Sequence, residues 1–339
     1  MRTLVVGVGA LGGVIAARLL AAGGGSVFLA TRTTESAAKL KQSGIRVIGV
    51  RDEVSVEVAE VAPIDEYRHR DPFDLIVLAT KAHDAIEVAP ALSGLLRPNG
   101  TLLPIQNGSV SELLAERLGN KSVLGGLSNL GATITAPGVY EQRNAGNLLI
   151  GELAGGDSER AEGVRRWLGR GVEVRTTPNI RGAVWSKLLL NCSVTTIGAI
   201  AGQTMREYIT SPEGRELFDR TYDEALSVAL ASGARPEAML VDPIPPGWRR
   251  RSILGEAHDA WLEQILKGYG DVKPSMLQDF ERGRRTEIDF INGYVVKLGR
   301  RHGLETPTNV AIVETVYAIA ERRLASAPAL LRRILQASR

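Results

Sequence analysis

Short apolar runs and segments with helical periodicity alternate along the first half of the chain. The runs are rich in Val, Leu and Ile, which is typical of strands buried on both faces of a parallel sheet. This pattern predicts strands at Leu4–Val6, Ser26–Thr31, Asp74–Ala79, Thr101–Pro104 and Ser122–Leu127. The intervening helices are expected at Leu11–Ala22, Glu35–Gln42, Ala85–Leu96 and Ser109–Leu118. Strands and helices in this order predict a doubly wound sheet covered on both faces.

Two shorter features add to this sheet. The segments Ile45–Val50 and Val54–Val58 flank the polar triplet 51–53, and together they predict a β-hairpin. The apolar segment Leu148–Gly151 is expected to form a smaller antiparallel edge.

Helical periodicity replaces the strand pattern from about Pro178 onward. Helices are expected at Arg181–Ala201, Arg215–Ser232 and Glu287–His302. The proline-rich segment 243–247 must be a loop, since prolines interrupt both helices and sheets. We therefore predict an α/β protein with two domains, a Rossmann-type doubly wound sheet over residues 1–177 and an all-α domain over residues 178–339.

Composition excludes several classes of protein. The chain has 339 residues, 44% of them apolar, and a net charge of +3, which gives no reason to expect a nucleic-acid surface. One cysteine, Cys192, excludes an internal disulfide, and the four histidines have no metal-ligand spacing. We find neither a signal-peptide pattern nor 18 uninterrupted apolar residues, so a cytoplasmic protein without a membrane span is expected.

The first strand runs into the turn Gly7-Val8-Gly9-Ala10-Leu11-Gly12, which opens a predicted helix. Gly7 permits the tight turn, Gly9 lets a pyrophosphate approach the backbone, and Gly12 lets the helix pack on the strand. The helix N-terminus supplies free N–H groups to the phosphates. The context favours a dinucleotide site over a glycine-rich corner without a ligand.

The end of the second strand bears on the choice of cofactor. An NADH enzyme usually has Asp or Glu there, whereas this chain has Arg32 between threonines. A guanidinium suits the 2′-phosphate of NADPH, so NADP(H) is the expected cofactor. A solvated arginine at a strand end is the alternative.

Two later strands also end in polar residues. Lys81 follows one of them, and Gln106-Asn107-Gly108 follows the next. Open α/β sheets bind ligands at the carboxyl ends of their strands, so Lys81 and Asn107 are predicted to contact the cofactor or substrate. Taken singly, each would more often be a turn or cap residue.

The long apolar helix of the second half carries Lys187 and Asn191 four residues apart, with Thr195 one turn further. Residues at this spacing share one helix face. A lysine among leucines needs a partner or a lowered pKa, and such a lysine can donate a proton to a carbonyl oxygen. A lysine that extends from a core helix to solvent explains the spacing equally well.

Glu287 and Ser275 lie at predicted helix starts. Thr286 is expected to be an N-cap with Glu287 in the first turn, and Ser275 an N-cap with Gln278 completing a capping box. The N-terminus of a helix can also bind a substrate carboxylate.

These residues make the chain resemble the ketopantoate reductase (2-dehydropantoate 2-reductase) family. The resemblance covers nearly the whole length. The segments that carry it are GVGALG at 7–12, LATKAHD around Lys81, IQNG at 105–108, WSKLLLNC at 185–192, and PSMLQD with RTEIDFINGYV at 274–295. The last pair is far more particular to this family than the glycine turn.

The resemblance implies a role for each of these residues. Lys187 would donate the proton, with Glu287 near the reacting carbonyl and the cofactor. Asn107 would contact cofactor and substrate, and Asn191, Thr195 and Ser275 would bind the substrate. The cofactor would also contact Arg32, Lys81 and the backbone of Ala132. The reaction would be NADPH-dependent reduction of ketopantoate to pantoate for coenzyme A synthesis, in an enzyme with a small-molecule partner, no nucleic-acid or membrane partner, and a homodimer as an open possibility.

Two departures from the family pattern bear on the substrate. Thr195 stands where the family's best-known members have a second asparagine, and the stretch from Arg235 to Lys273 is long, with a Trp248–Arg251 cluster. A reductase of another 2-oxo or 3-hydroxy acid is therefore one alternative. A non-catalytic NADPH-binding regulator is another, although a sensor would need none of the second-domain polar residues.

Overall fold

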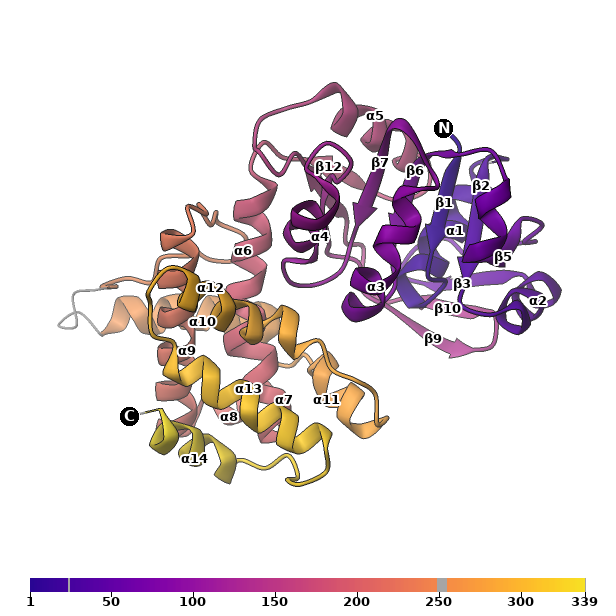
Figure 1. Ribbon diagram of the computed structural model, residues 1–339. Helices are drawn as coiled ribbons and strands as arrows, with labels where there is room; N and C mark the ends of the chain where they lie inside the picture. The colour runs from indigo at the N-terminus through magenta and orange to yellow at the C-terminus, as the bar shows by residue number, and fades with distance from the viewer. Residues whose placement is uncertain (24, 249–254, 339) are drawn as a thin grey trace. The chain divides into compact units, whose positions relative to one another are not determined.

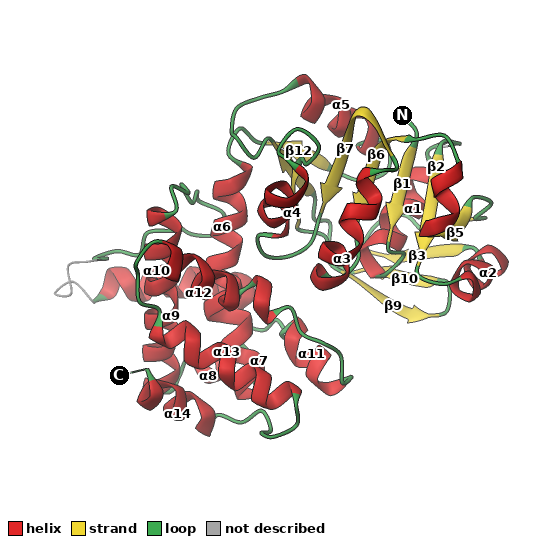
Figure 2. Ribbon diagram, viewed as in Figure 1, coloured by secondary structure: helices red, strands yellow, loops and turns green. Residues whose placement is uncertain are grey.

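The computed structural model describes residues 1–23, 25–248 and 255–338 (Figure 1). The chain divides into two compact units, Met1–Ile180 and Arg181–Arg339. The domain boundary expected at 177/178 lies just before this division. Strands in the described residues belong to the first unit, and the second unit is helical (Figure 2). The predicted fold class is confirmed.

A five-stranded parallel sheet forms the centre of the first unit. The three central strands are short and almost wholly buried, because their apolar side chains are covered on both faces. The strand order is β5 (Val61–Pro63), β2 (Val27–Thr31), β1 (Thr3–Val6), β6 (Phe73–Leu78), β7 (Leu96–Pro104). The prediction missed β5, and it began β7 five residues late.

A smaller sheet continues from β7. A single parallel bridge joins Leu102 to Val123, just before β8 (Gly125–Ser128). Strand β8 pairs antiparallel with β11 (Leu148–Gly151), which pairs with β12 (Val174–Thr176). The predicted antiparallel edge at 148–151 is confirmed. The strand predicted at 122–127 is present as β8, which begins three residues later and ends one residue later.

Helices cover the sheets of the first unit, as Figures 1 and 2 show. Each predicted helix is present within a few residues, and α5 was not predicted. Their bounds are α1 (Ala10–Ala21), α2 (Thr34–Ser43), α3 (Ala82–Ser93), α4 (Val110–Leu118) and α5 (Glu159–Leu168), with a 3₁₀ helix η1 (Ile64–His69).

The predicted hairpin forms, but it belongs to a separate four-stranded sheet. Its strands β3 (Ile45–Gly49) and β4 (Val54–Val56) are joined by β10 (Val139–Gln142) and β9 (Ala132–Ala136), in the order β4-β3-β10-β9. This second sheet packs on α1, which also packs on the parallel sheet. Helix α1 is therefore covered by a sheet on two sides.

Two buried side chains of β10 hold the second sheet against α1. The ring of Tyr140 lies against Gly13, where an added Cβ would overlap it. The Tyr140 hydroxyl donates to the carbonyl of Val8, 3.2 Å away. Gln142 accepts from Nε of the buried Arg18 at 2.9 Å.

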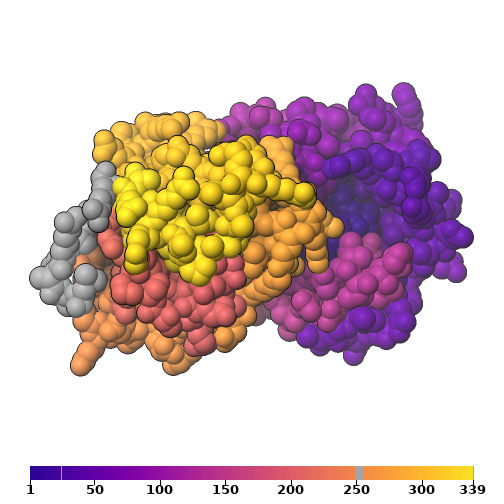
Figure 3. Space-filling view, turned by 90° about the horizontal axis from the view of Figure 1, so that it is seen from below, coloured from indigo at the N-terminus to yellow at the C-terminus, as the bar shows by residue number. Residues whose placement is uncertain are grey.

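The second unit is a packed set of helices. The C-terminal helix packs against α7, α9 and α13, and it covers this end of the unit in the space-filling view (Figure 3). The bounds are α6 (Ile180–Leu190), α7 (Thr196–Ala201), α8 (Met205–Tyr208), α9 (Pro212–Ala231), α10 (Glu256–Tyr269), α11 (Ser275–Glu281), α12 (Asn292–Arg301), α13 (Pro307–Ala320) and α14 (Ala329–Ala337), with a 3₁₀ turn η3 (Ile288–Phe290).

The helix predicted at 181–201 is present but not uniform. A π-helical turn, η2 (Asn191–Thr195), separates α6 from α7. Residues 180–201 are long and apolar enough to cross a membrane, yet 89% of the tested window is buried inside the protein. It is the core helix of the second unit.

Two predicted helix starts are wrong. Glu287 lies before the short turn η3, and α12 begins only at Asn292, because the backbone of Ile291 leaves helical geometry. Thr286 is buried and does not cap that helix. Ser275 is the first residue of α11; the cap position belongs to Pro274, whose carbonyl accepts from the N–H of Gln278, so the expected capping box is absent.

Within the described residues of the stretch 235–273, one helix is present, α10, which was not predicted. The proline-rich segment 243–247 is a loop, as predicted. Three of the four residues in the Trp248–Arg251 cluster lie outside the described residues.

We expect Gly13→Ala to destabilise the protein by about 1–3 kcal/mol, because the added methyl group overpacks the ring of Tyr140. Gly163→Ala in α5 is the matched control. Nothing lies within 4 Å of its added Cβ, so helix propensity should stabilise the protein by up to about 1 kcal/mol. Urea unfolding measures both variants. Equal midpoints for the two would contradict close packing at Gly13.

Candidate active site

The carboxyl ends of four parallel strands bring the first group of predicted residues to one edge. Gly7 follows β1, Arg32 follows β2, Lys81 lies three residues after β6, and Asn107 lies three residues after β7. The chain moves to one side of β1 for β2 and to the other side for β6. The glycine turn therefore lies at the topological switch point, where open α/β sheets bind ligands.

The glycine turn has no room for side chains at two positions. Gly7 has φ +90°, and a Cβ there would lie 2.6 Å from Cγ2 of Thr80. A Cβ at Gly12 would overlap the carbonyl oxygen of Gly7. Gly9, by contrast, is exposed and is the N-cap residue of α1, whose first turn contains no acidic residue. This open helix N-terminus can accept an anion such as a phosphate.

Arg32 lies in solvent at the end of β2. Its side chain is 77% exposed, and its guanidinium forms an ion pair with Asp84 of α3 at 2.7 Å. An exposed ion pair contributes about 0–1 kcal/mol, so an incoming anion can displace Asp84. The ion pair thus holds Arg32 near the carboxyl edge of the sheet, and the fold does not depend on it.

Lys81 and Asn107 differ in their surroundings. Lys81 is exposed and precedes the first residue of α3. Asn107 is partly buried and is followed by Gly108 at φ +75°, a conformation that favours glycine. Between the two strand ends, Nε2 of Gln106 donates to the carbonyls of Leu78 (2.8 Å) and Thr80 (3.1 Å).

Ala132 comes from the second sheet. It begins β9, is partly buried, and packs against the core of the unit. Strand β9 packs on α1, so Ala132 belongs to the strands that face the glycine-turn helix, not to the parallel sheet. The sequence pattern had not predicted this strand.

Lys187 is the most perturbed titratable group of the predicted site. It lies on α6 and is partly buried among the leucines of that helix. Burial lowers the pKa of Lys187 to about 8, while the nearby Glu287 carboxylate raises it and so offsets part of that effect. A lysine with this pKa can both hold and release a proton near neutral pH.

The π-helical turn begins one turn after Lys187, at Asn191. Asn191 is 7% exposed, and its backbone carbonyl accepts from the hydroxyls of Thr195 and Thr196, each at 3.0 Å. The hydroxyl hydrogen of Thr195 is thus used within the helix. With its hydroxyl in this orientation, Thr195 can offer a substrate only an acceptor.

Side chains from other helices form hydrogen bonds to the backbone carbonyls of the π-helical turn. The hydroxyl of Tyr208 donates to the carbonyl of Ser193 at 2.8 Å, and Nδ2 of Asn292 points to the carbonyl of Cys192 at 3.4 Å. Nδ2 of Asn292 also donates to Asn309 at 2.9 Å. The turn is therefore fixed by buried side chains of α8, α12 and α13.

Ser275 and Glu287 come from different elements of the second unit. Ser275 is exposed at the start of α11, which packs against α7, the continuation of the Lys187 helix. Glu287 ends the loop before η3 and acts on the charge of Lys187. The second unit thus brings Lys187, Asn191 and Glu287 together, although nearly 100 residues separate Glu287 from the other two.

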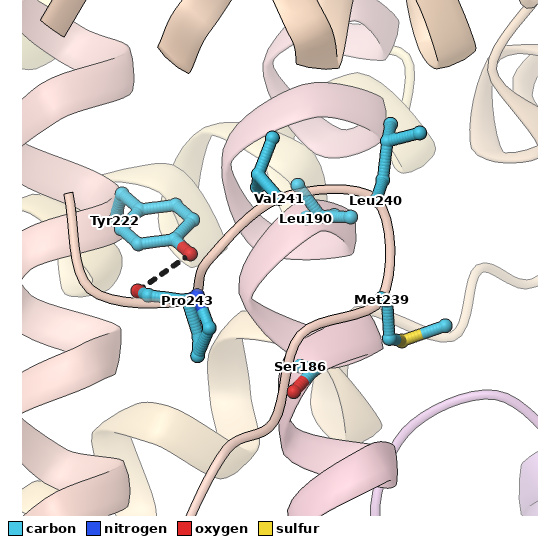
Figure 4. Close-up of a pocket in the computed structure, with 7 residues that line it drawn as sticks. All are labelled: Ser186, Leu190, Tyr222, Met239, Leu240, Val241 and Pro243. Carbon is cyan, nitrogen blue, oxygen red and sulfur yellow. Dashed lines mark hydrogen bonds between the residues drawn. The ribbon is translucent and has the colours of Figure 1, made fainter. Parts of the chain in front are cut away.

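A small hollow lies beside the Lys187 helix, and Figure 4 shows its lining. Leu190, three residues after Lys187, forms part of the wall. The remaining lining residues are Ser186, Tyr222, Met239, Leu240, Val241 and Pro243.

The loop that covers this hollow is anchored at both ends. The N–H of Glu237 donates to the hydroxyl of Ser186 at 2.8 Å, and the hydroxyl of Tyr222 donates to the carbonyl of Pro243 at 2.9 Å (Figure 4). Between these anchors, Met239 and Leu240 are 39% and 38% exposed. The loop holds two apolar side chains at the surface next to α6.

The described residues support neither a metal site nor a reactive cysteine. Across residues 1–23, 25–248 and 255–338, no group of three or more His, Cys, Asp or Glu side chains is arranged to hold a metal ion. Cys192 is buried, and burial raises the pKa of its thiol well above the usual range, so it is inert.

Sequence reasoning missed Asp84 and Tyr140. Asp84 could have been noticed because it lies three residues after Lys81, directly before the predicted helix Ala85–Leu96. Tyr140 gave no signal, since its strand pairs with residues about ninety positions earlier.

Two family models match the chain. The model for the ketopantoate reductase PanE/ApbA matches residues 3–155, and the model for the ketopantoate reductase PanE/ApbA C terminal matches residues 179–320.

Relatives and solved structures agree with these models. The 2-dehydropantoate 2-reductase of Pyrococcus abyssi is 28% identical over 92% of this chain and 95% of its own length. A ketopantoate reductase structure from Ralstonia eutropha has a TM-score of 0.79 at 23% identity, covering 95% of this chain and 99% of its own. A D-mandelate dehydrogenase solved with NADH and anilino(oxo)acetate has a TM-score of 0.77 at 22% identity, with the same coverage of both chains, which shows a shared fold.

The family models together span both compact units, and the relatives match over almost their full length. The chain therefore belongs to the ketopantoate reductase family, whose members are oxidoreductases that act on CH–OH groups.

Proposed function

We propose that this protein reduces ketopantoate (2-dehydropantoate) to pantoate with NADPH, the step that supplies pantoate for pantothenate and coenzyme A synthesis. The observation that carries the proposal is Lys187, a partly buried lysine with a pKa lowered to about 8, placed near Glu287 and one turn from Asn191. A binding protein without catalysis has no use for such a group.

The first unit supports a dinucleotide cofactor. The turn Gly7–Gly12 leaves the backbone accessible at Gly9, and the start of α1 offers N–H groups without a competing acid. We assign the phosphates to this turn, the adenosine 2′-phosphate to Arg32 and Lys81, and the nicotinamide side to Asn107 and the backbone of Ala132. Bound NADPH would supply the hydride.

The second unit supports proton donation. Reduction of a 2-oxo group places negative charge on the carbonyl oxygen, and the protonated Lys187 can neutralise it by giving up a proton. We assign to Glu287 the role of keeping this lysine protonated near neutral pH, because its charge raises the pKa of Lys187. Asn191 and Ser275 would bind the substrate hydroxyl and carboxylate, and Thr195 would contribute as an acceptor.

A second candidate is reduction of a 2-oxo acid with a larger apolar side chain. The anchored loop favours it, since Met239 and Leu240 are held at the surface beside Leu190, one turn from Lys187. Apolar side chains held in this way can cover an apolar substituent of the substrate. The reaction and the proton donor stay the same in both candidates.

The proposal is tested by following NADPH oxidation with ketopantoate and with a panel of 2-oxo acids that includes branched and aromatic side chains. We expect ketopantoate to give the highest kcat/KM. Faster turnover of a bulky 2-oxo acid, lowered by Met239→Ser but not by the same change at the exposed Val50, would favour the second candidate. No oxidation with any of the acids would refute the reductase.

We expect Arg32→Asp to lower the preference for NADPH over NADH. The variant loses a charge-assisted contact to the 2′-phosphate, worth about 1.5–3 kcal/mol, so the ratio of kcat/KM values should fall about ten- to a hundredfold. Arg46→Asp is the control, since Arg46 is also exposed and paired, with Glu53, in the second sheet. An unchanged ratio in the Arg32 variant would remove Arg32 from the site.

Reduction should slow as the pH rises above about 8. Lys187 must be protonated to act as an acid, and above its pKa the protonated fraction falls tenfold per pH unit. Glu287→Gln removes the charge that raises this pKa, so the fall should begin at lower pH. Asp289→Asn is the control, since Asp289 bonds Tyr317 instead.

In the same assay Lys187→Ala should lower turnover at least about a hundredfold. Near-native turnover in this variant would exclude Lys187 as the proton donor, and a pH profile that Glu287→Gln leaves unchanged would remove Glu287 from the role assigned to it.

A further inference from the structure

The glycine turn is held by side chains that do not belong to the parallel sheet. Tyr140 lies in the middle of the second sheet, opposite Val47 of β3 and Ile134 of β9. It is 4% exposed, its ring lies against Gly13, and its hydroxyl donates to the carbonyl of Val8 at 3.2 Å. A strand from elsewhere in the chain thus bonds directly to the backbone of the turn.

The opposite side of the turn is also fixed. Thr80 packs against Gly7, so closely that any side chain at Gly7 would meet it. Thr80 is in turn held by Gln106, whose Nε2 donates to its carbonyl and to that of Leu78. Both acceptors are carbonyls, which fixes the orientation of the Gln106 amide.

Such contacts matter because glycines make this turn flexible. Glycine loses more conformational freedom on ordering than any other residue, so an unsupported turn would have to be ordered when the dinucleotide binds. Support that exists before binding removes this cost and tightens binding. The hydrogen bond to Val8 also leaves this carbonyl paired, away from the phosphates that the turn would receive.

We propose that Tyr140 is a positioning residue for the cofactor: through the carbonyl of Val8 it holds the glycine turn in its binding conformation. The inference rests on the proposed function, since it needs the turn to bind a dinucleotide. Gln106, acting through Thr80, supports the turn from the other side.

Tyr67 provides a matched control within the same unit. It is 1% exposed, and its hydroxyl donates to a backbone carbonyl, that of Leu29, at 2.9 Å. Burial raises the pKa of both phenols, that of Tyr67 to about 12. The two tyrosines therefore make the same kind of buried bond, one to the turn and one to the interior of β2.

The experiment compares Tyr140→Phe with Tyr67→Phe, each of which removes one hydroxyl. The measurements are the Kd for NADPH from its fluorescence, KM for NADPH, KM and kcat for the best 2-oxo acid of the panel, and urea unfolding. Tyr140→Phe should raise Kd and KM for NADPH about two- to tenfold, the value of one hydrogen bond, while kcat and the KM of the acid stay within twofold. Tyr67→Phe should leave all four kinetic and binding values unchanged, whatever it does to stability.

An unchanged Kd in Tyr140→Phe, or an equal change in both variants, would overturn the inference and leave Tyr140 a purely structural residue. Failure of the wild-type protein to bind NADPH would instead refute the proposed cofactor. If Tyr140→Phe does not fold, Gln106→Met tests the other support, because it keeps the length of the side chain and removes the donor. A rise in the Kd for NADPH supports the inference there too, and an unchanged Kd counts against it.

Discussion

The close packing of α1 on two sheets is the constraint on which the first unit depends. Where the backbone or a ring comes closest to the helix, only glycine fits, and α1 has Gly12 against the carbonyl of Gly7 and Gly13 against the ring of Tyr140. Close contact with Gly7 in turn forces the tight turn that exposes Gly9. The features that look like a binding motif in the sequence are thus also requirements of packing, and the same glycines serve the fold and the site.

In the second unit, buried polar side chains, and not close packing against glycine, fix the backbone next to the candidate site. Its core helix contains a π-helical turn, which leaves backbone carbonyls that the regular helix would have paired. Tyr208 and Asn292 bond these carbonyls, and Asn309, which bonds Asn292, also donates to Glu224 at 2.8 Å. Glu224 accepts from two N–H groups at the start of α13. The backbone next to Asn191 is therefore connected to four other helices, α8, α9, α12 and α13, which hold it in one geometry.

The sequence predicted what local pattern determines. Continuous apolar strands, the glycine turn and the long core helix follow from neighbouring residues, and all are present. The sequence predicted β3 and β4 of the second sheet but not β9 and β10. Strand β10 pairs with β3, which lies about ninety residues earlier, and no local pattern records such a pairing. The start of α12 was misplaced because Ile291 leaves helical geometry despite fitting the apolar period. The spacing of Lys187 and Asn191 indicated a shared face, whereas the approach of Glu287 could be expected only from the family resemblance, since tertiary packing brings it there.

The physical difference between the two units explains why the reaction is easier to infer than the substrate. Phosphate binding at a helix start needs little beyond glycine and an open backbone, so it can be recognised from a short motif. The proton donation that we propose needs one lysine with a lowered pKa, and burial, partly offset by Glu287, gives Lys187 such a pKa. Substrate choice depends instead on the shape of the pocket wall, which many side chains from distant parts of the chain determine together. One methylene in an apolar pocket changes discrimination by only about 1–3 kcal/mol. Differences of that size come from a few side-chain contacts, so a substrate can change without any change in the short motifs that identify the fold and the family.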